Sequence, residues 1–343
     1  MGIETTEQRT EQDVIKASSA FAHEDVRRSW FYLVTSLGLQ FGTQLVVALI
    51  PLWWVRLPLA IIAGLLTARS FMIFHDFKHG AILRGSKPAK WIMDAFGLYV
   101  LTPSTVWTQT HNYHHAHTAK LVGSHVGSYM MLTTALWEKA TPGQRFMYKL
   151  VRHPVTILLG YFTVFIYGFC TAAFLRNPRK NLDSALALVV QITMVAVLWR
   201  YLGAETMFYT LLLPQLIAHA VGAYLFYAQH NFPEAHVQPR ESWTFARAAL
   251  ESSSYMKFGP VMNFFTGNIG YHHVHHLNHR IPFYRLPEAM AAIPELRNPV
   301  GVTSLYPRDI IACFKLKLWD PEQGKLVGFP KAQTGDESKL ASA

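Results

Sequence analysis

Long stretches without a charged residue constrain the fold of this chain of 343 residues more than any other feature. Residues 31 to 50 carry no formal charge, and a helix needs about 20 such residues to cross roughly 30 Å of hydrocarbon. Residues 57 to 74 form a second apolar stretch that only Arg69 interrupts. Two more uncharged stretches, 184 to 199 and 206 to 229, follow later in the chain. The pattern predicts four transmembrane helices, which short links pair into two hairpins.

The distribution of basic residues predicts which ends of these helices share a side. Lys and Arg cluster around Arg27 and Arg28, in residues 78 to 90 and in residues 176 to 180, whereas each hairpin link has a single Arg. The positive-inside rule places the clusters in the cytosol. The apolar stretch from 155 to 175 then begins and ends on that side, so we expect an interfacial or re-entrant helix there. A topology with six crossings is the alternative.

Composition supports a membrane protein and excludes several other classes. Hydrophobic residues make up 51% of the chain and charged residues 15%, whereas about a quarter of an ordinary soluble domain is charged. Only two cysteines are present, which excludes a disulfide scaffold and any metal site built from four thiolates. The net charge of +10 suits a face turned toward anionic lipid headgroups or an acidic protein. No separate basic domain exists, so we expect no nucleic-acid partner.

Histidine is unusually frequent, with 17 in the chain, and nine of them fall in four places at or near the predicted cytosolic ends of apolar stretches. Positions i, i+3 and i+4 of a helix share a face, so the patterns HxxxH and HxxHH are each expected to aim their imidazoles at a common point. So many desolvated imidazoles would be costly to hold without a metal. The predicted metal ligands are His75, His79, His111, His114, His115, His230, His272, His275 and His276.

The number and type of ligands indicate the chemistry. Eight or nine nitrogen ligands exceed what one ion can accept, so two metal ions are expected. Imidazole suits several transition metals and does not select among them by itself. A pair of iron ions with open positions beside a hydrocarbon-lined cavity suits the activation of O2 against an unactivated C–H bond. No acid–base pair could break such a bond at neutral pH.

The histidine motifs resemble those of the integral-membrane fatty-acid desaturase family, especially its acyl-lipid branch. The motifs are His75-Asp76-Phe77-Lys78-His79, His111-Asn112-Tyr113-His114-His115 and His272-His273-Val274-His275-His276, and His230 resembles the isolated fourth histidine of that branch. The resemblance covers roughly residues 31 to 287. It implies a non-haem di-iron centre that uses O2 to remove two hydrogens from an acyl chain, with two electrons from an external donor.

The expected fold class, with the resemblance included, is an all-α membrane protein with four transmembrane helices in two hairpins, interfacial helices and a cytosolic helical cap. The expected parts are a cytosolic N-terminal tail (residues 1–30), the membrane di-iron domain (31–325) and a disordered C-terminal tail (326–343). The active site is expected on the cytosolic side of an integral membrane protein. The chain has no cytochrome b5 signature and no dinucleotide-binding loop, so the electrons are expected from a ferredoxin or a cytochrome b5 type donor.

A few positions depart from the family pattern. Phe77 and Lys78 stand where many relatives carry Cys and Gly, and Asn112 stands where Arg is frequent. Phe226 occupies the position at which the animal acyl-CoA branch usually has Asn, one turn before the isolated histidine. These departures spare the ligands, so they bear on substrate and regiochemistry more than on the metal centre.

Candidate supporting residues follow from the needs of bound imidazoles, which generally donate their other nitrogen to a carboxylate or carbonyl. Asp76 and Glu234 are candidate acceptors, with the role of a simple surface or helix-end charge as the alternative. Because Phe226 cannot hold a water beside the isolated histidine, that role would pass to a neighbour such as Asn231. Asn268 either supports a metal ligand or has a turn or capping role before a helix. His219 lies about 16 Å before His230 along one helix face, too far for the same metal site. It is a candidate substrate contact, or else it hydrogen-bonds to a neighbouring helix.

Two other functions are open at this point. A membrane hydroxylase or decarboxylase acting on fatty acids would keep the same ligands and differ in its product. A membrane metal transporter should place polar groups along a path through its spans, whereas only His219 lies deep in one. The membrane lipid or acyl substrate, its chain length and its carrier are not distinguished by the sequence.

Overall fold

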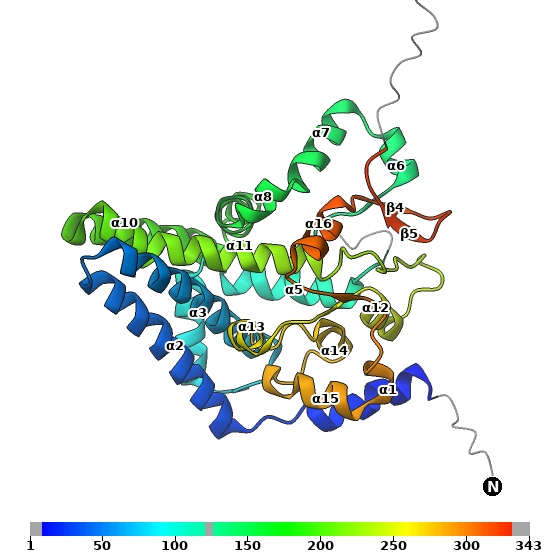
Figure 1. Ribbon diagram of the computed structural model, residues 1–343, viewed down its shortest axis with the longest axis horizontal. Coiled ribbons are helices and arrows are strands. Elements are labelled where there is room, and N and C mark those ends of the chain that lie inside the picture. Colours follow the sequence, from blue (N-terminus) through cyan, green and yellow to red (C-terminus); the bar gives the residue numbers. More distant parts are fainter. Residues whose placement is uncertain (1–8, 121–125, 331–343) are drawn as a thin grey trace, which may run out of the picture.

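Figure 1 shows a computed structural model of the chain, which describes residues 9–120 and 126–330. Within these two ranges, three continuous helical runs are long and apolar enough to cross a membrane. They are α2 (Val26–Leu49), α3 (Trp53–His79) and the run Leu182–Ala228, which comprises α10 (Leu182–Met207), the π-helical η3 (Phe208–Leu212) and α11 (Leu213–Ala228). The long helices fill the left half of Figure 1, and most of the shorter elements lie to the right.

The third run is two helices joined at a sharp turn. Gly203 has φ 83° and ψ 162°, which is not a helical conformation. The start of α10 lies beside α5 (Ser104–His117), where the Asp183 carboxylate accepts a hydrogen bond of 2.8 Å from the Thr105 N–H. The turn lies at the opposite end, where Glu205 pairs with Arg56 at the start of α3. Helix α11 then returns toward α5, where the rings of Phe226 and Trp107 have centroids 5.7 Å apart, so the two halves of the run point in opposite directions.

Local sequence determines where the first pair of long helices begins and ends. Asp25 caps α2, because its carboxylate accepts a hydrogen bond from the Arg28 N–H at 3.1 Å. Helix α3 ends immediately after His79 because Gly80 adopts the left-handed conformation (φ 66°) that favours glycine. The last turn of α3 therefore presents His75 and His79 at the end of an apolar helix.

The apolar stretch from 155 to 175 forms a broken helix. It comprises α8 (Pro154–Leu158), the π-helical η2 (Tyr161–Ala172) and α9 (Ala173–Arg176). The continuous apolar part, Tyr161–Arg176, is shorter than the roughly 20 residues of a typical crossing. The predicted interfacial or re-entrant position of the whole stretch stays a prediction.

Shorter elements surround the ends of α3 and α11. The helices are α1 (Glu11–Ser18), η1 (Ser19–Phe21), α4 (Lys87–Tyr99), α6 (Thr134–Lys139), α7 (Pro142–Val151), α12 (Phe245–Glu251), α13 (Pro260–Phe265), α14 (His272–Leu277), η4 (Phe283–Arg285), α15 (Leu286–Ala292), η5 (Pro294–Leu296) and α16 (Pro307–Lys315). The strands are β1 (Leu132–Thr133), β2 (Tyr255–Met256), β3 (Val302–Thr303), β4 (Leu318–Asp320) and β5 (Lys325–Val327). Strand β1 pairs parallel to β4 and β4 pairs antiparallel to β5, while β2 pairs parallel to β3.

Three details differ from the sequence-based expectations. The protein is mainly helical, but the short strands mean that it is not strictly all-α. Residues 9–30 do not form a free tail, since Val14 of α1 is buried, Ser18 accepts a hydrogen bond from the Asn278 amide and Arg9 forms an ion pair with Glu295. The first residues of the predicted C-terminal tail belong to β5, and residues 331–343 lie outside the described part. Tails of this kind are hard to delimit because short polar segments acquire order only through contacts that are distant in sequence.

Helices α3 and α11 approach closely at Gly64. A Cβ added there would lie 2.8 Å from Cβ of Ile217 and 2.9 Å from the Pro214 carbonyl oxygen. Gly64→Ala is therefore expected to lower the free energy of unfolding by about 1–3 kcal/mol, despite the better helix propensity of alanine. Gly42→Ala on α2 is the matched control, because its Cβ would meet nothing within 4 Å. Denaturant titration in detergent measures both, and equal effects would contradict the close approach.

Candidate metal centre

All nine predicted ligands lie together where four segments meet. The last turn of α3 supplies two histidines, α5 supplies three, α14 supplies three, and His230 follows the end of α11. Eight of the side chains are buried, and His230 is partly buried. Backbone segments more than 190 residues apart in sequence thus converge on one place, since His75 and His275 have ring centroids 4.7 Å apart.

The nine imidazoles form two groups. Within each group, the potential ligand atoms all lie within 4.8 Å of one another. The first group contains five histidines and the second contains four. Members of the first are His75, His79, His111, His115 and His275, and members of the second are His114, His230, His272 and His276. Two groups of this size match the expectation of two metal ions.

Each HxxHH motif is divided between the two groups. In both motifs the i and i+4 histidines join one group and the i+3 histidine joins the other. The expectation that each motif aims its imidazoles at a common point is therefore corrected. Positions i+3 and i+4 point about 100° apart around a helix, which is enough to separate neighbours such as His114 and His115. Each of α5 and α14 consequently contributes to both groups and holds them at a fixed separation.

Distances between the imidazoles fit a metal at the centre of each group. In the second group, Nε2 of His230 lies 3.0 Å from Nε2 of both His114 and His272. In the first, Nε2 of His111 lies 2.9 Å from that of His75 and 3.2 Å from that of His115. Two nitrogens bound at about 2.1 Å to one ion, at right angles, lie about 3.0 Å apart. The spacing is thus the one expected of ligands sharing an ion.

Hydrogen bonds at the other ring nitrogens fix the protonation of two ligands. Nδ1 of His230 lies 2.8 Å from the Ser252 carbonyl oxygen, which can only accept a hydrogen bond. Nδ1 of His75 lies 3.0 Å from Oδ1 of Asp76. A neutral imidazole that donates from Nδ1 has a lone pair at Nε2. In both residues this lone pair faces the Nε2 atoms of other histidines. A cation bound between these nitrogens would accept their lone pairs and stabilise the arrangement.

Burial keeps the imidazoles outside the long helices neutral. It lowers the pKa of His230 to about 4. Burial is the main reason that the pKa values of the ligand histidines of α5 and α14 lie well below their usual range, and the neighbouring imidazoles are the second reason. These ligands are His111, His114, His115, His272, His275 and His276. Neutral imidazole is the form that binds metal, so the donor set is ready for a cation at neutral pH. The residues present therefore fit a pair of transition-metal ions.

Asp76 and Asn268 take part in one hydrogen-bonded connection next to the first group. The Asp76 carboxylate contacts His75 through one oxygen and accepts a 2.6 Å hydrogen bond from the Phe283 N–H through the other. The Asn268 amide donates to the Phe283 carbonyl oxygen at 3.1 Å. Asn268 also adopts a positive φ of 58° in the turn before α14. It thus serves the turn and steadies the segment that holds Asp76, without touching a ligand.

The other two candidate supporting residues point elsewhere. Asn231 is buried, and its amide bonds to Arg152 and to the carbonyl oxygens of Cys313 and Leu316. Glu234 is exposed, and no hydrogen bond joins it to a histidine within the described residues. The predicted roles of both residues beside the metal receive no support from these positions. The Ser252 carbonyl, which sequence reasoning missed, takes the place expected of a side-chain acceptor at His230.

Two further histidines lie close to the groups. His273 is fully buried between ligands in sequence, but its Nε2 lies 3.1 Å from the Leu296 carbonyl oxygen and it belongs to neither group. His279 has its ring centroid 4.7 Å from that of His79, so it borders the first group. It lies two residues beyond the end of α14, so helical spacing within that helix did not indicate this position.

An apolar cavity reaches the centre from the side of the long helices. Most of its wall is hydrocarbon, with Phe71, Met72 and Leu225 among the lining residues, and His75, His111 and His272 lie at its border. His219 also lines it, and its Nε2 lies 2.9 Å from the Val100 carbonyl oxygen. The hydrogen bond to a neighbouring segment, one of the two alternatives for His219, is present; the other, a contact with the substrate, stays a prediction.

Comparisons with known proteins agree with this arrangement. The family model "Fatty acid desaturase" matches residues 51–304. The chain is 28% identical over 335 residues to a fatty acid desaturase of Bacillus subtilis, covering 95% of this chain and 93% of the relative. It is 23% identical over 323 residues to the sn-1 oleoyl-lipid 12-desaturase of a Synechocystis species (91% and 90% covered), and 24% identical over 262 residues to the Delta(12)-fatty-acid desaturase of Arabidopsis thaliana (71% and 65% covered). The match extends over most of the chain and includes every histidine of the two groups. The chain therefore belongs to the fatty acid desaturase family.

Proposed function

We propose that this protein desaturates fatty-acyl chains of membrane lipids at a centre of two iron ions, with O2 as co-substrate. The observation that carries this proposal is the position of two groups of buried or partly buried imidazoles at the border of an apolar cavity. Iron bound there would supply the oxidising power for an unactivated C–H bond. Imidazole alone does not select iron, so the choice of metal and of O2 rests on the family and on the difficulty of the reaction.

The histidine groups assign a role to each ligand. The first group of five would hold one ion and the second group of four the other, with α5 and α14 bridging both. Asp76 would keep His75 in the tautomer that presents Nε2, and the Ser252 carbonyl would do the same for His230. A site with four or five protein ligands per ion leaves few positions for water. Trp107 stacks on His111 with centroids 4.5 Å apart and further limits access.

The apolar cavity is the proposed site of the acyl chain. Most of its lining residues come from α3 and α11, and Phe165 of η2 and His111 of α5 also contribute, so a chain that enters it is held against the histidines. A hydrocarbon chain gains about 0.8 kcal/mol for each CH2 group that such a wall removes from water. Among the described residues of this wall, His219 is the one ionisable group outside the metal centre, and we place it beside the chain as a fixed, hydrogen-bonded contact.

Four membrane crossings, with the histidines on the cytosolic side, complete the proposal. The two hairpins have their turns at one end and the histidines at the other. The basic residues near the histidines outnumber those at the turns, as the positive-inside rule requires of a cytosolic face. Electrons would come from a separate protein, and a relative from a Nostoc species is named sn-1 acyl-lipid omega-3 desaturase (ferredoxin). A ferredoxin is thus the first donor to test, before a cytochrome b5 type donor.

Expression in a host that lacks this activity tests the function directly. Fatty-acid profiling by mass spectrometry is expected to show a new product two hydrogens lighter than its precursor. A gain of one oxygen or a shortened chain would instead indicate the hydroxylase or decarboxylase alternative. Unchanged lipids, with iron-loaded protein and a competent reductant supplied, would contradict all three.

Asp76→Asn is expected to lower the affinity for the metal of the first group by about 10- to 100-fold, the usual effect of losing such a partner. An asparagine amide can donate to Nδ1 of His75 and so favour the proton on Nε2, where the lone pair is needed. Metal titration of the purified protein measures the change. Glu322→Gln, which alters an exposed carboxylate, is the control. Equal affinities of the Asp76→Asn variant and the unaltered protein would show that Asp76 does not orient His75.

A further inference from the structure

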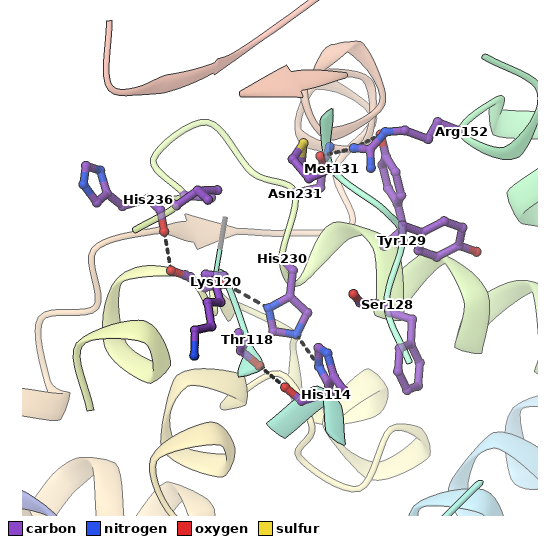
Figure 2. Close-up of a pocket in the computed structure, with 16 residues that line it drawn as sticks. His114, Thr118, Lys120, Ser128, Tyr129, Met131, Arg152, His230, Asn231 and His236 are labelled. Carbon is purple, nitrogen blue, oxygen red and sulfur yellow. Dashed lines mark hydrogen bonds between the residues drawn. The ribbon is translucent and has the colours of Figure 1, made fainter. Parts of the chain in front are cut away.

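A second cavity borders the histidine centre, and its character is different from that of the apolar cavity. His114 and His230 of the second group lie at its border, and Phe226 lines both cavities. Figure 2 shows Arg152 beside Asn231 on one wall, Lys120 on the opposite side, and His230 and His114 between and below them. The cavity thus combines basic side chains with direct access to two proposed metal ligands.

Arg152 is a buried cation whose guanidinium, among the described residues, forms hydrogen bonds with neutral groups only. Its side chain is almost completely buried, with a relative exposure of 1%. Nη1 donates to the Met130 carbonyl oxygen at 2.9 Å, and Nη2 donates to the Tyr227 hydroxyl at 3.3 Å and to Oδ1 of Asn231. Nε has no hydrogen-bond partner in the described part of the chain. A guanidinium so far from water is costly to hold without a counter-charge.

The surroundings of Arg152 add positive charge and no negative charge. No Asp or Glu is among the described residues that line the cavity, whereas Lys120 is. Outside the cavity wall, the Lys317 Nζ donates to the Arg152 carbonyl oxygen at 2.6 Å. Burial, and then the charge of Arg152, lowers the pKa of Lys317 to about 8. The counter-charge for this cluster is therefore missing from the described protein.

We propose that this cavity binds the negatively charged oxygen group, a carboxylate or a phosphate, of the lipid whose acyl chain is oxidised, and that Arg152 pairs with it. The inference rests on the proposed desaturase function. Arg152 bonds to Asn231, which directly follows His230, so an anion held there lies next to the centre. The acyl chain would pass Phe226 from the basic cavity into the apolar one. Arg152 would thereby position the chain relative to the metal and restrict the substrate to anionic lipids.

Binding of matched charged and neutral lipids to the purified full-length protein tests this proposal without turnover. The carboxylate probe is hexadecanoic acid and its neutral counterpart is the methyl ester. The phosphate probe is 1-hexadecanoylglycerol 3-phosphate and its neutral counterpart is 1-hexadecanoylglycerol. We expect at least one charged probe to bind about tenfold more tightly than its counterpart, since one charge-assisted hydrogen bond contributes about that much. Which charged probe shows the preference identifies a free acid or a phospholipid as the source.

Variants then locate the preference. Arg152→Gln is expected to weaken binding of the preferred charged probe about tenfold and to change binding of the neutral probe less than twofold, while Arg152→Lys retains part of the preference. Lys149→Gln removes an exposed charge from the same helix and should change neither. If Arg152→Gln does not fold, Lys120→Gln on the opposite side of the cavity should weaken only charged-probe binding, about threefold.

Two results would overturn the proposal. Equal binding of charged and neutral probes by the unaltered protein would show that Arg152 only braces the segments around it. A charge preference that survives both Arg152→Gln and Lys120→Gln would place the anion elsewhere. A failure of the proposed function is distinguishable from both, because it would leave the binding preference intact and yield no desaturated product in the expression host.

Discussion

His275→Ala is expected to abolish desaturation, to below about one thousandth of the activity of the unaltered protein. His275 belongs to the first group of ligands, is fully buried, and has its Nε2 3.2 Å from that of His115. Loss of a metal removes several kcal/mol of stabilisation of the reacting state, which corresponds to at least three orders of magnitude in rate. Metal analysis should show a loss of one ion per chain, and fatty-acid profiling should show no product.

His273→Ala is the matched control for this result. His273 lies on the same short helix, is equally buried and bonds to the Leu296 carbonyl oxygen instead of facing either group. Its replacement should lower thermal stability, because a buried carbonyl loses its partner, yet both metal ions and the product should remain. If the two variants lost metal and activity equally, the separation of α14 into ligand and non-ligand positions would be wrong.

Gly222→Phe is expected to shorten the acyl chains that the protein accepts. Gly222 lines the apolar cavity, and a Cβ added there would meet nothing within 4 Å, so the new side chain has room to enter. Each CH2 group that the phenyl ring excludes forfeits about 0.8 kcal/mol, and exclusion of two or three lowers kcat/KM for the longest substrate by roughly 10- to 100-fold. Product profiles with acyl chains of graded length measure the shift.

Gly42→Phe provides the comparison for the cavity. Gly42 lies on an exposed face of α2, where an added Cβ also meets nothing within 4 Å. This variant makes the same replacement in a long apolar helix, with the same change in side-chain volume and helix propensity. It should leave the preference for acyl-chain length unchanged. A uniform loss of activity on all chain lengths in Gly222→Phe, without a shift in preference, would contradict the placement of the acyl chain.

Much of the site could be predicted because its signals are local in sequence. Helical spacing marks His111, His114 and His115 as neighbours, and the position of His75 and His79 at the end of an uncharged stretch predicts where they lie. Gly80 ends the helix immediately afterwards, which is again a local property. Length and absence of charge likewise predict the long apolar helices α2 and α3 and the run Leu182–Ala228. All nine histidines accordingly lie where the sequence predicts a shared site.

The remainder depends on contacts that no local pattern encodes. The division of α5 between two groups is decided by where α3 and α14 approach it, so spacing alone predicted one target for His114 and His115. The partner of His230 is a backbone carbonyl, which every residue possesses and which therefore leaves no signature at Ser252. Arg152 is unremarkable in sequence, and only the packing of α7 against the end of α11 reveals it as a buried cation.

Metal content combined with X-ray absorption of the purified protein tests the central claim most directly. Two histidine groups predict two iron ions per chain, each with a first shell dominated by imidazole nitrogen at about 2.1 Å. The same measurement on His275→Ala should give a single ion. A fully active preparation with no bound metal, or one with a single ion per chain, would contradict the account.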